Sequence, residues 1–318
     1  MLTTSLSIAG GLILLLAGGE SLVRGSVAVA RSLKVSPLLI GLTLVGFGTS
    51  TPELVTSLQA AFAGSPGIAV GNIVGSNTGN ILLILGIAAL IAAIAGHPGA
   101  FRRDGAVLIG SALLGTGVML FGTMTRPAGL ILVVLLIAYV VWTYLTERGH
   151  PESESAALHA GEAGLAEPVP ARLGLSLVLA ASGIAMTILG ARLLVGGTMT
   201  LAREAGISET LLGLTLVAVG TSLPELVTSV IAALRRQGEI AFGNVVGSNI
   251  YNILGILGVT ALVHPIAVPP EVLRLDVWVM IAATFLLAAF TVTGWRITRL
   301  EGGVCLAGYV GYIAVLAV

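Results

Sequence analysis

Long, continuous apolar stretches dominate this sequence and constrain its fold more than any other feature. About ten of them, each near the length of a membrane-spanning helix, are bounded by Gly, Pro or charged residues. Strands of a membrane barrel would alternate apolar and polar residues instead. Only 9% of the 318 residues are charged, whereas roughly 25% is usual in soluble domains. The sequence therefore predicts an all-α integral membrane protein.

The expected spans cover nearly the whole chain and leave one soluble-looking segment between them. This segment, residues 148–171, is rich in Glu, Ala, Pro, Ser and Gly, a composition typical of a mobile linker. The spans are expected near residues 5–30, 37–63, 68–95, 105–123, 127–146, 172–202, 209–234, 240–262, 273–294 and 298–317.

The basic residues between the spans predict how the chain lies in the membrane. With the N-terminus outside, the loops on the opposite side hold ten Lys and Arg residues, and the loops on the N-terminal side hold three. An excess of basic residues marks cytoplasmic loops. We therefore expect a multi-pass cell-membrane protein with both termini outside and the 148–171 linker in the cytoplasm. The net charge of zero argues against a nucleic-acid-binding protein.

The sequence repeats itself at a fixed offset of 172 residues. GLTLVGFGTSTPELVTSL at 41–58 and GLTLVAVGTSLPELVTSV at 213–230 match at fourteen of eighteen positions. GNIVGSNTGNI at 71–81 and GNVVGSNIYNI at 243–253 match at eight of eleven. This period is too long for a solenoid and indicates a duplicated half-protein.

Each half contains five expected spans, and this odd number turns the second half upside down in the membrane. Inverted repeats are a transporter architecture, with the ion site where the repeats meet near the bilayer midplane. We therefore expect about ten transmembrane helices, arranged as a first five-helix repeat at 1–147, the linker at 148–171 and a second, inverted repeat at 172–318.

Two glutamates, Glu53 and Glu225, occupy the same position of the duplicated segment, in the interior of their spans. An ionised carboxylate in the membrane interior is costly and faces a cavity or a partner. No basic residue is placed to neutralise either one, so a cation that binds and leaves is the expected partner. A proton-bridged pair with a purely structural role is the alternative.

Residues with oxygen donors accompany both glutamates. Proline in Gly48-Thr49-Ser50-Thr51-Pro52-Glu53 removes a backbone N–H and predicts a kinked turn with a free carbonyl at Gly48. Residues 220–225 repeat this pattern. In the next span of each half, a serine and an asparagine are four residues apart and share a helix face. Oxygen ligands of this kind suit a hard cation such as Ca²⁺. For these serines and asparagines, hydrogen bonding between helices is the alternative.

At these motifs the sequence resembles a known family. GTSTPELVTS and GTSLPELVTS, with GNIVGSNTGN and GNVVGSNIYN, are similar to the two alpha-repeats of the sodium/calcium exchangers, within the cation/Ca²⁺ exchanger superfamily. The resemblance covers nearly the whole chain, and the short linker indicates a prokaryotic-type member. It implies a secondary active antiporter, not an enzyme, that exchanges Na⁺ for Ca²⁺ by alternating access. These ions are its substrates, and no cofactor is expected.

Transferred position by position, the resemblance implies a cluster of Na⁺ and Ca²⁺ sites. Glu53 and Glu225 would be the central carboxylates, shared by both ions. Ser50 and Ser222 belong to the same turns, where bonding back to the helix is the alternative. The other oxygens implied are those of Thr49 and Thr221 at the Ca²⁺ site, Ser76, Ser248 and the carbonyls of Gly46 and Ala218 at flanking Na⁺ sites, and Asn80 and Asn252 in the middle.

One position departs from the family pattern. Several members carry Asp where this chain has Asn252, and an acid there is linked to the K⁺-dependent branch, so Asn252 argues against K⁺ co-transport. The site is left with two formal negative charges, which one Ca²⁺ or two Na⁺ neutralise. The usual three-to-one stoichiometry is thus only implied by the resemblance.

Several alternatives remain open at the level of sequence. The nearest is a Ca²⁺/H⁺ exchanger of the same superfamily, in which the two glutamates would carry protons. A passive channel is a more distant alternative. A hydrolase that uses Ser50 or Ser222 is also distant, since no central span holds a histidine that could act as its base. Glycines in the first and sixth spans predict either a sliding helix pair or simply close packing. The expected partners are Ca²⁺, Na⁺ and the lipid bilayer; no protein partner can be inferred.

Overall fold

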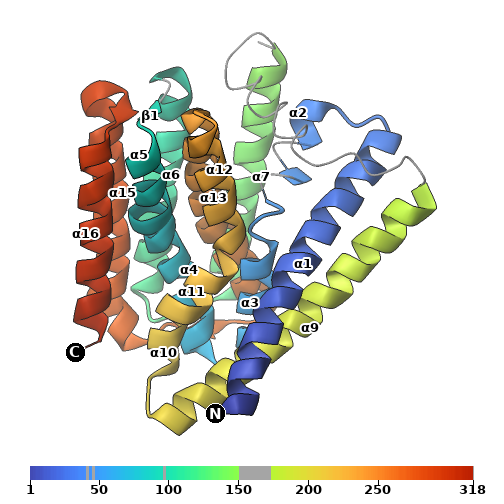
Figure 1. Cartoon of the computed structure of the whole chain (residues 1–318), viewed down its shortest axis with the longest axis vertical. Coiled ribbons are helices and arrows are strands. Elements are labelled where there is room, and N and C mark those ends of the chain that lie inside the picture. Colours follow the sequence, from blue (N-terminus) through green and yellow to red (C-terminus); the bar gives the residue numbers. More distant parts are fainter. Residues whose placement is uncertain (41–42, 45–46, 96–97, 150–172, 318) are drawn as a thin grey trace.

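The computed structural model describes residues 1–40, 43–44, 47–95, 98–149 and 173–317. Within these ranges the protein is almost entirely helical (Figure 1). The elements of the first half are α1 (Leu2–Ser32), α2 (Pro37–Ile40), α3 (Thr51–Phe62), α4 (Pro66–Gly79), the π-helix η2 (Asn80–Leu85), α5 (Gly86–Ile91), β1 (Ile94–Ala95), α6 (Pro98–Met119), β2 (Thr123–Met124) and α7 (Arg126–Gly149).

The second half follows a similar order of elements. They are α9 (Leu173–Ala205), α10 (Glu209–Leu212), the π-helix η3 (Gly213–Val217), α11 (Ala218–Thr221), α12 (Leu223–Leu234), α13 (Gly238–Tyr251), the π-helix η4 (Asn252–Leu257), α14 (Gly258–Val263), β3 (Ile266–Ala267), the π-helix η5 (Val272–Asp276), α15 (Val277–Gly294), β4 (Arg296–Ile297) and α16 (Arg299–Leu316).

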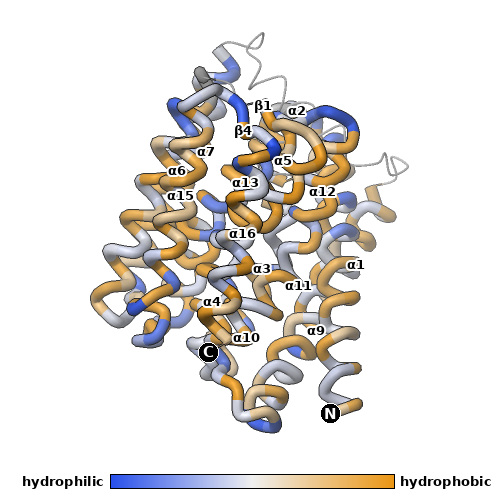
Figure 2. The backbone as a smooth tube through the Cα atoms, turned by 60° about the vertical axis from the view of Figure 1, so that its left-hand side comes forward, coloured by the Kyte–Doolittle hydropathy of each residue, from blue (hydrophilic) through white to orange (hydrophobic). Residues whose placement is uncertain are grey.

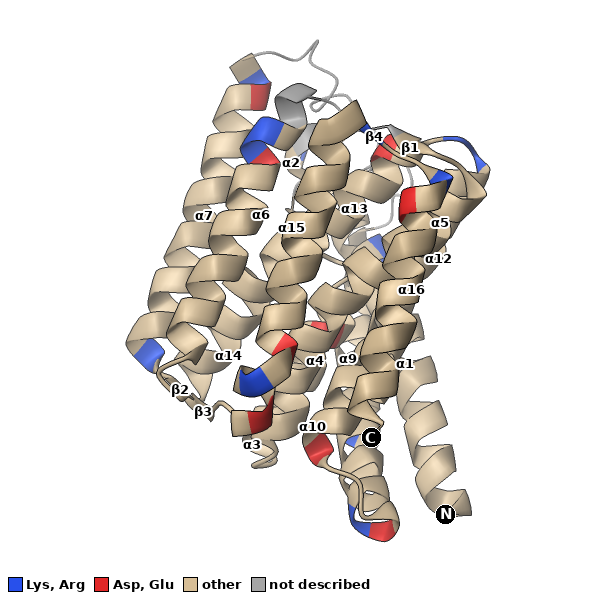
Figure 3. Cartoon of the chain, turned by 90° about the vertical axis from the view of Figure 1, so that its left-hand side faces the viewer, with Lys and Arg blue, Asp and Glu red and all other residues tan. Residues whose placement is uncertain are grey.

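The prediction of an all-helical membrane protein is confirmed. Among the described residues, seven helices are long and apolar enough to span a membrane, or eight if the bent helix over residues 209–234 is one span. Hydrophobic residues run along the helices (Figure 2), and most charged residues lie near the two ends of the bundle (Figure 3). The count of ten spans stays a prediction, and the 148–171 linker lies almost wholly outside the described residues.

The helices that carry the second duplicated motif form the centre of the bundle. In the most apolar stretches of residues 66–91 and 238–263, 83% and 78% of the residues are buried. The corresponding values for α1 and α9 are 28% and 22%, so these two helices lie at the periphery. A helix that is apolar on all sides belongs in the interior of a large bundle. The motif residues of α4 and α13 are therefore shielded from lipid.

Glycines bring α1 and α9 into direct backbone contact along an antiparallel interface (Figure 1). A Cβ on Gly11 would lie 2.6 Å from the Leu194 N atom, and a Cβ on Gly183 would lie 2.5 Å from the Leu22 N atom. Gly11 and Gly183 are equivalent at the 172-residue offset, so the two halves contribute alike to this interface. Small residues allow this close approach of membrane helices. The packing role of these glycines is thus confirmed.

Two short antiparallel ladders connect the halves at opposite ends of the bundle (Figure 3). In one, β1 pairs with β4, with Ile94 opposite Ile297. In the other, β2 pairs with β3, with Thr123 opposite Ala267. Each ladder joins a segment that follows a helix of one half to a segment of the other. They mark the two ends of the bundle, which we call the β1–β4 end and the β2–β3 end.

Candidate ion-binding site

Each copy of the first motif breaks its helix directly before the glutamate. Residues 47–50 form a turn, and α3 begins at Thr51 with Pro52 in its first turn. In the second half, α11 ends at Thr221 and α12 begins at Leu223, with a bend of 49° between the two segments. The predicted kink is therefore confirmed. The predicted free carbonyl at Gly48 is wrong, because its oxygen accepts a hydrogen bond from the Thr51 N–H at 3.2 Å.

The two glutamates lie in the first turns of the helices that follow these breaks. Glu53 is in the first turn of α3, Glu225 is in the first turn of α12, and each is only 1% exposed. The N-terminus of a helix carries partial positive charge, which favours a carboxylate there. This placement offsets a part of the cost of burying the two negative groups.

Hydrogen bonds cross between the halves at these glutamates. Ser50 Oγ donates to Glu225 Oε1 at 2.8 Å, and Ser222 Oγ donates to Glu53 Oε1 at 2.8 Å. Each carboxylate is thus oriented by the serine of the other repeat. The sequence placed both serines in the motif turns, but it did not indicate which carboxylate each would contact. The structure brings all four residues into one buried cluster.

Several buried oxygens of this cluster have no hydrogen-bond partner among the described residues. Both carboxylates use Oε1 toward a serine, and their Oε2 atoms are the unpartnered ones. Leaving such atoms unpaired is costly in a protein interior. The other unpartnered oxygens of predicted site residues are Thr49 Oγ1, Ser248 Oγ, Asn80 Oδ1 and Asn252 Oδ1.

On one side of the cluster, the oxygens of Ser222, Ser76 and Ala218 form a row of successive close contacts. Ser222 Oγ lies 3.0 Å from Ser76 Oγ, which in turn lies 3.5 Å from the Ala218 carbonyl oxygen. These three residues also line a small pocket between α4 and α11. Gly46, whose carbonyl is expected to play the part of Ala218 in the other half, lies outside the described residues.

The two predicted asparagines begin a local change in helix geometry. The helix of α4 continues as a π-helix from Asn80, and that of α13 continues as a π-helix from Asn252. Asn80 Nδ2 donates to Asn249 Oδ1 at 3.0 Å, so the motif helices of the two halves meet here. Short π-helical turns are frequent at functional sites. The sequence pattern gave no sign of them, although the motif that contains them is duplicated.

Two further asparagines belong to the site and were missed in the sequence analysis. Asn72 Nδ2 donates to the Glu53 carbonyl oxygen at 3.2 Å, and Asn244 Nδ2 donates to the Glu225 carbonyl oxygen at 3.2 Å. Both occupy the second position of the GN-x-VGSN motif and are equivalent at the 172-residue offset. Their duplication is the signal that could have identified them.

The chemistry of the cluster is that of a site for a hard cation. The described site residues offer two carboxylates, hydroxyls and amide oxygens, and neither carboxylate forms an ion pair with a described Lys, Arg or His. No group of three or more His, Cys, Asp or Glu is found within the described ranges, as a site for a softer metal would require. Ca²⁺ and Na⁺ are cations that oxygen ligands of this kind accommodate.

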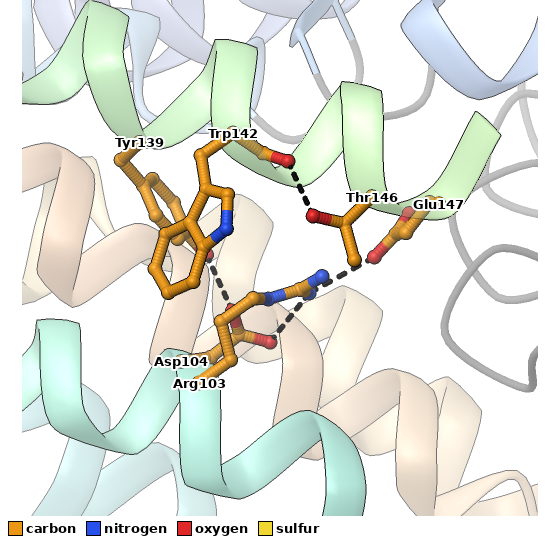
Figure 4. A network of polar contacts seen from close by, with 6 residues as sticks. All are labelled: Arg103, Asp104, Tyr139, Trp142, Thr146 and Glu147. Atoms are coloured by element: carbon orange, nitrogen blue, oxygen red, sulfur yellow. Dashed lines mark hydrogen bonds and ion pairs between the residues drawn. The ribbon is translucent and has the colours of Figure 1, made fainter. Parts of the chain in front are cut away.

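A second polar cluster lies between α6 and α7, apart from this site (Figure 4). Arg103 pairs with Asp104 at 2.7 Å and with Glu147 at 2.9 Å, and Tyr139 Oη donates to Asp104 at 3.0 Å. Asp276, equivalent to Asp104 at the 172-residue offset, accepts a hydrogen bond from Tyr312 at 2.8 Å. The aspartate is therefore duplicated between these helices, and the paired charges of Arg103, Asp104 and Glu147 indicate a structural role.

A central, oxygen-lined cluster built from a duplicated motif defines this protein as a helical membrane protein of the ion-transporter class. The family model described as "Sodium/calcium exchanger protein" matches residues 4–145 and 175–318. The chain thus belongs to the sodium/calcium exchanger family, whose members are antiporters. The resemblance stated from the motifs is confirmed.

Individual relatives match over nearly their whole length. The putative antiporter CaxA of Alkalimonas amylolytica is 37% identical, with 98% of each chain covered. The sodium/calcium exchanger MaX1 of Methanosarcina acetivorans is 36% identical, with 96% of each covered. A structure of the sodium-calcium exchanger NCX_Mj soaked with Na⁺ and Sr²⁺ superposes with a TM-score of 0.66 at 33% identity, over 98% of each chain.

Proposed function

We propose that this antiporter exchanges Na⁺ for Ca²⁺ and binds both ions at the cluster around Glu53 and Glu225. The observation that carries the proposal is the set of buried oxygens without hydrogen-bond partners among the described residues, which includes one carboxylate oxygen of each glutamate. The names of MaX1 and NCX_Mj, which describe sodium/calcium exchangers, support the choice of ions. The remaining ligands would come from Ser50, Ser76, Ser222, Thr49, Thr221, Ser248, Asn80 and Asn252.

Overlap between the sites couples the two ions. Ca²⁺ and Na⁺ compete for the same carboxylates, and two unneutralised glutamates are too costly to enclose in a low-dielectric interior. Only ion-loaded forms then change their access from one side of the membrane to the other. The chain of Ser222, Ser76 and Ala218 oxygens provides neutral ligands for a flanking Na⁺ site.

The arrangement of the halves supports alternating access. The equivalent helices α1 and α9 run antiparallel, as expected for two inverted five-helix repeats at 1–147 and 172–318 joined by the linker at 148–171. Leu12 of α1 lies against Gly220 of α11, and Val23 of α1 lies against Gly48 in the turn at 47–50. We infer that α1 and α9 move as a pair across the site. The positive-inside rule places the β1–β4 end and the linker in the cytoplasm and both termini outside.

Transport by the purified protein in liposomes tests the driving ion. Vesicles loaded with Na⁺ and diluted into Na⁺-free buffer, with pH equal and clamped on both sides, should accumulate Ca²⁺. Vesicles loaded with choline are the control and should not. If a pH gradient drives uptake and a Na⁺ gradient does not, the protein is a Ca²⁺/H⁺ exchanger and the Na⁺ assignment is wrong.

A further inference from the structure

The amide group of Asn72 contacts both halves of the site at once. Asn72 is fully buried on α4, and its Nδ2 donates to the Glu53 carbonyl oxygen at 3.2 Å and to Ser57 Oγ at 2.9 Å. Its Oδ1 accepts a hydrogen bond from Thr221 Oγ1 at 3.0 Å. Thr221 belongs to the second half, whereas Glu53 and Ser57 belong to the first. One side chain therefore ties the first turn of α3 to a hydroxyl from the opposite repeat.

Asn244 makes the same amide N–H contacts in the second half of the chain. Its Nδ2 donates to the Glu225 carbonyl oxygen at 3.2 Å and to Ser229 Oγ at 3.0 Å. The contact of the amide oxygen differs. The hydroxyl equivalent to that of Thr221 is Thr49 Oγ1, which has no partner among the described residues. The two copies thus share their contacts within a repeat and differ in the contact between repeats.

The contact between Thr221 and Asn72 can orient the Thr221 hydroxyl for binding a cation. A hydroxyl that binds a cation turns a lone pair toward the ion, and its single hydrogen must then point to an acceptor elsewhere. The Asn72 amide oxygen is such an acceptor, and the Val217 carbonyl oxygen on the same helix as Thr221, at 3.0 Å, is another. Only the bond to Asn72 makes the orientation of the hydroxyl depend on the position of the other half.

We propose that Asn72 is a positioning residue for the ion site, which orients the Thr221 hydroxyl through its amide oxygen and holds the first turn of α3 through its amide N–H groups. Asn244 holds the first turn of α12 through its amide N–H groups in the same way. The inference rests on the proposed function, because it assumes that Thr221 contributes its oxygen to bound Ca²⁺.

Three variants separate the positioning role from simple packing. Asn72→Ala removes all three hydrogen bonds and should weaken Ca²⁺ binding about tenfold, in line with the loss of hydrogen bonds to a charged site. Asn72→Asp keeps an acceptor oxygen for Thr221 but loses the N–H donors to Glu53 and Ser57, so it should weaken Ca²⁺ binding less than Asn72→Ala does. Thr78→Val is the matched control, because Thr78 is buried on α4 and, among the described residues, its hydroxyl bonds only to Val74 of its own helix.

A double-mutant cycle with Thr221→Val completes the test, with Ca²⁺ binding measured by calorimetry on the detergent-purified protein. The loss in the double variant should be smaller than the sum of the two single losses, because Thr221→Val removes the hydroxyl that Asn72→Ala leaves without its orienting acceptor. Equal weakening by Asn72→Ala and Asn72→Asp, or full additivity with Thr221→Val, would overturn the proposal. The measurement does not use Na⁺-driven transport, so a wrong driving ion leaves it valid, and a wild-type protein that binds no Ca²⁺ refutes the proposed function itself.

Discussion

The two halves of the site contain equivalent polar residues but differ in the side chains around them. On one side, Ser76, Ala218 and Ser222 line a pocket together with Gly79 and Val219. At the 172-residue offset, Gly79 corresponds to Tyr251 and Val219 corresponds to Phe47. These two rings are stacked, with their centroids 4.3 Å apart and their planes 9° from parallel. The half of the site that contains Ser76 thus has a pocket where the equivalent half, which contains Ser248, has an aromatic stack.

This comparison separates the polar residues, which match between the two halves, from the residues around them, which differ. Both halves supply Glu, Ser, Thr and Asn at matching positions, as the proposed site, which takes oxygens from both halves, requires. Gly79 and Val219, and their counterparts Tyr251 and Phe47, are not among the proposed ligands, and they differ between the halves. The hydroxyls also differ in their contacts, since Thr221 is bonded to Asn72 while Thr49 has no partner among the described residues. The site is duplicated in composition and asymmetric in its contacts.

The largest effect is expected where the halves are most alike. Glu53→Gln and Glu225→Gln should each reduce Ca²⁺ transport in proteoliposomes to background, because each removes one of the two charges that neutralise Ca²⁺. Glu20→Gln is the control, since Glu20 is an exposed residue of α1 paired with Arg24. Retained exchange in either glutamate variant, with uptake of radioactive Ca²⁺ as the readout, would show that the two carboxylates do not act as a pair.

The interface of α1 with α9 should also respond equally to equivalent changes. Gly11→Ala and Gly183→Ala each place a Cβ within 2.6 Å of a backbone nitrogen of the other helix, so each should force the helices apart at a cost of about 1–3 kcal/mol. We expect a lower midpoint of thermal unfolding and slower exchange in both. Gly10→Ala and Gly196→Ala are matched controls, because nothing lies within 4 Å of a Cβ at either position.

If only one member of the Gly11 and Gly183 pair lowers the unfolding midpoint, the interface is not shared equally and the equivalence of the halves fails at this point. If the Gly10 and Gly196 controls slow exchange as strongly as the test variants, the effect comes from helix propensity and not from the contact between helices.

The aromatic stack should give an effect at one face only. Tyr251→Ala removes a stacked pair worth about 0.5–1.5 kcal/mol and opens the approach beside Ser248, so it should change the KM for Ca²⁺ by about two- to tenfold at one membrane face. Tyr251→Phe keeps the stack and is the control. Uptake measured separately in right-side-out and inside-out vesicles resolves the faces, and equal effects at both would show that the stack does not control access.

The duplicated motifs made most of the site predictable from the sequence. Glu53 and Glu225 stood out because charge is scarce and both occur at one position of a repeat, and the kinks before them followed from Pro52 and Pro224. The contacts between the halves were not predictable, because they depend on how two helices cross and not on any local pattern. The pairing of Ser50 with Glu225 and the stacking of Phe47 on Tyr251 are examples of such contacts.

Local rules also failed at span ends and in the second motif. Glu147 and Asp276 are buried, 1% and 2% exposed, although hydropathy placed them at the ends of spans, where charged residues usually meet water. Their partners, Arg103 and Tyr312, come from other helices, so no sequence window contains the compensating group. The π-helices at Asn80 and Asn252 likewise carry no distinct composition.

The smallest effect is expected at Asn252, where a substitution tests whether the middle of the cluster is also equivalent between halves. Asn252 Oδ1 has no partner among the described residues, so Asn252→Asp keeps the oxygen and adds a negative charge without breaking a described hydrogen bond. Asn80→Asp adds the same charge but loses the Nδ2 bond to Asn249. Both should alter the number of Na⁺ exchanged per Ca²⁺ or the pH dependence of exchange, and only Asn80→Asp should also lower thermal stability, by about 1 kcal/mol.

Reversal potentials measured at several Na⁺ gradients give the stoichiometry. Initial rates measured over about one pH unit to either side of neutrality give the pH profile. A third carboxylate brings the site to three negative charges, which one Ca²⁺ alone no longer neutralises, so an added Na⁺ or a proton must accompany it. An unchanged stoichiometry together with an unchanged pH profile in Asn252→Asp would show that this oxygen is a bystander. The ion would then be held by the carboxylates and hydroxyls, and the asparagines would serve only to join the two halves.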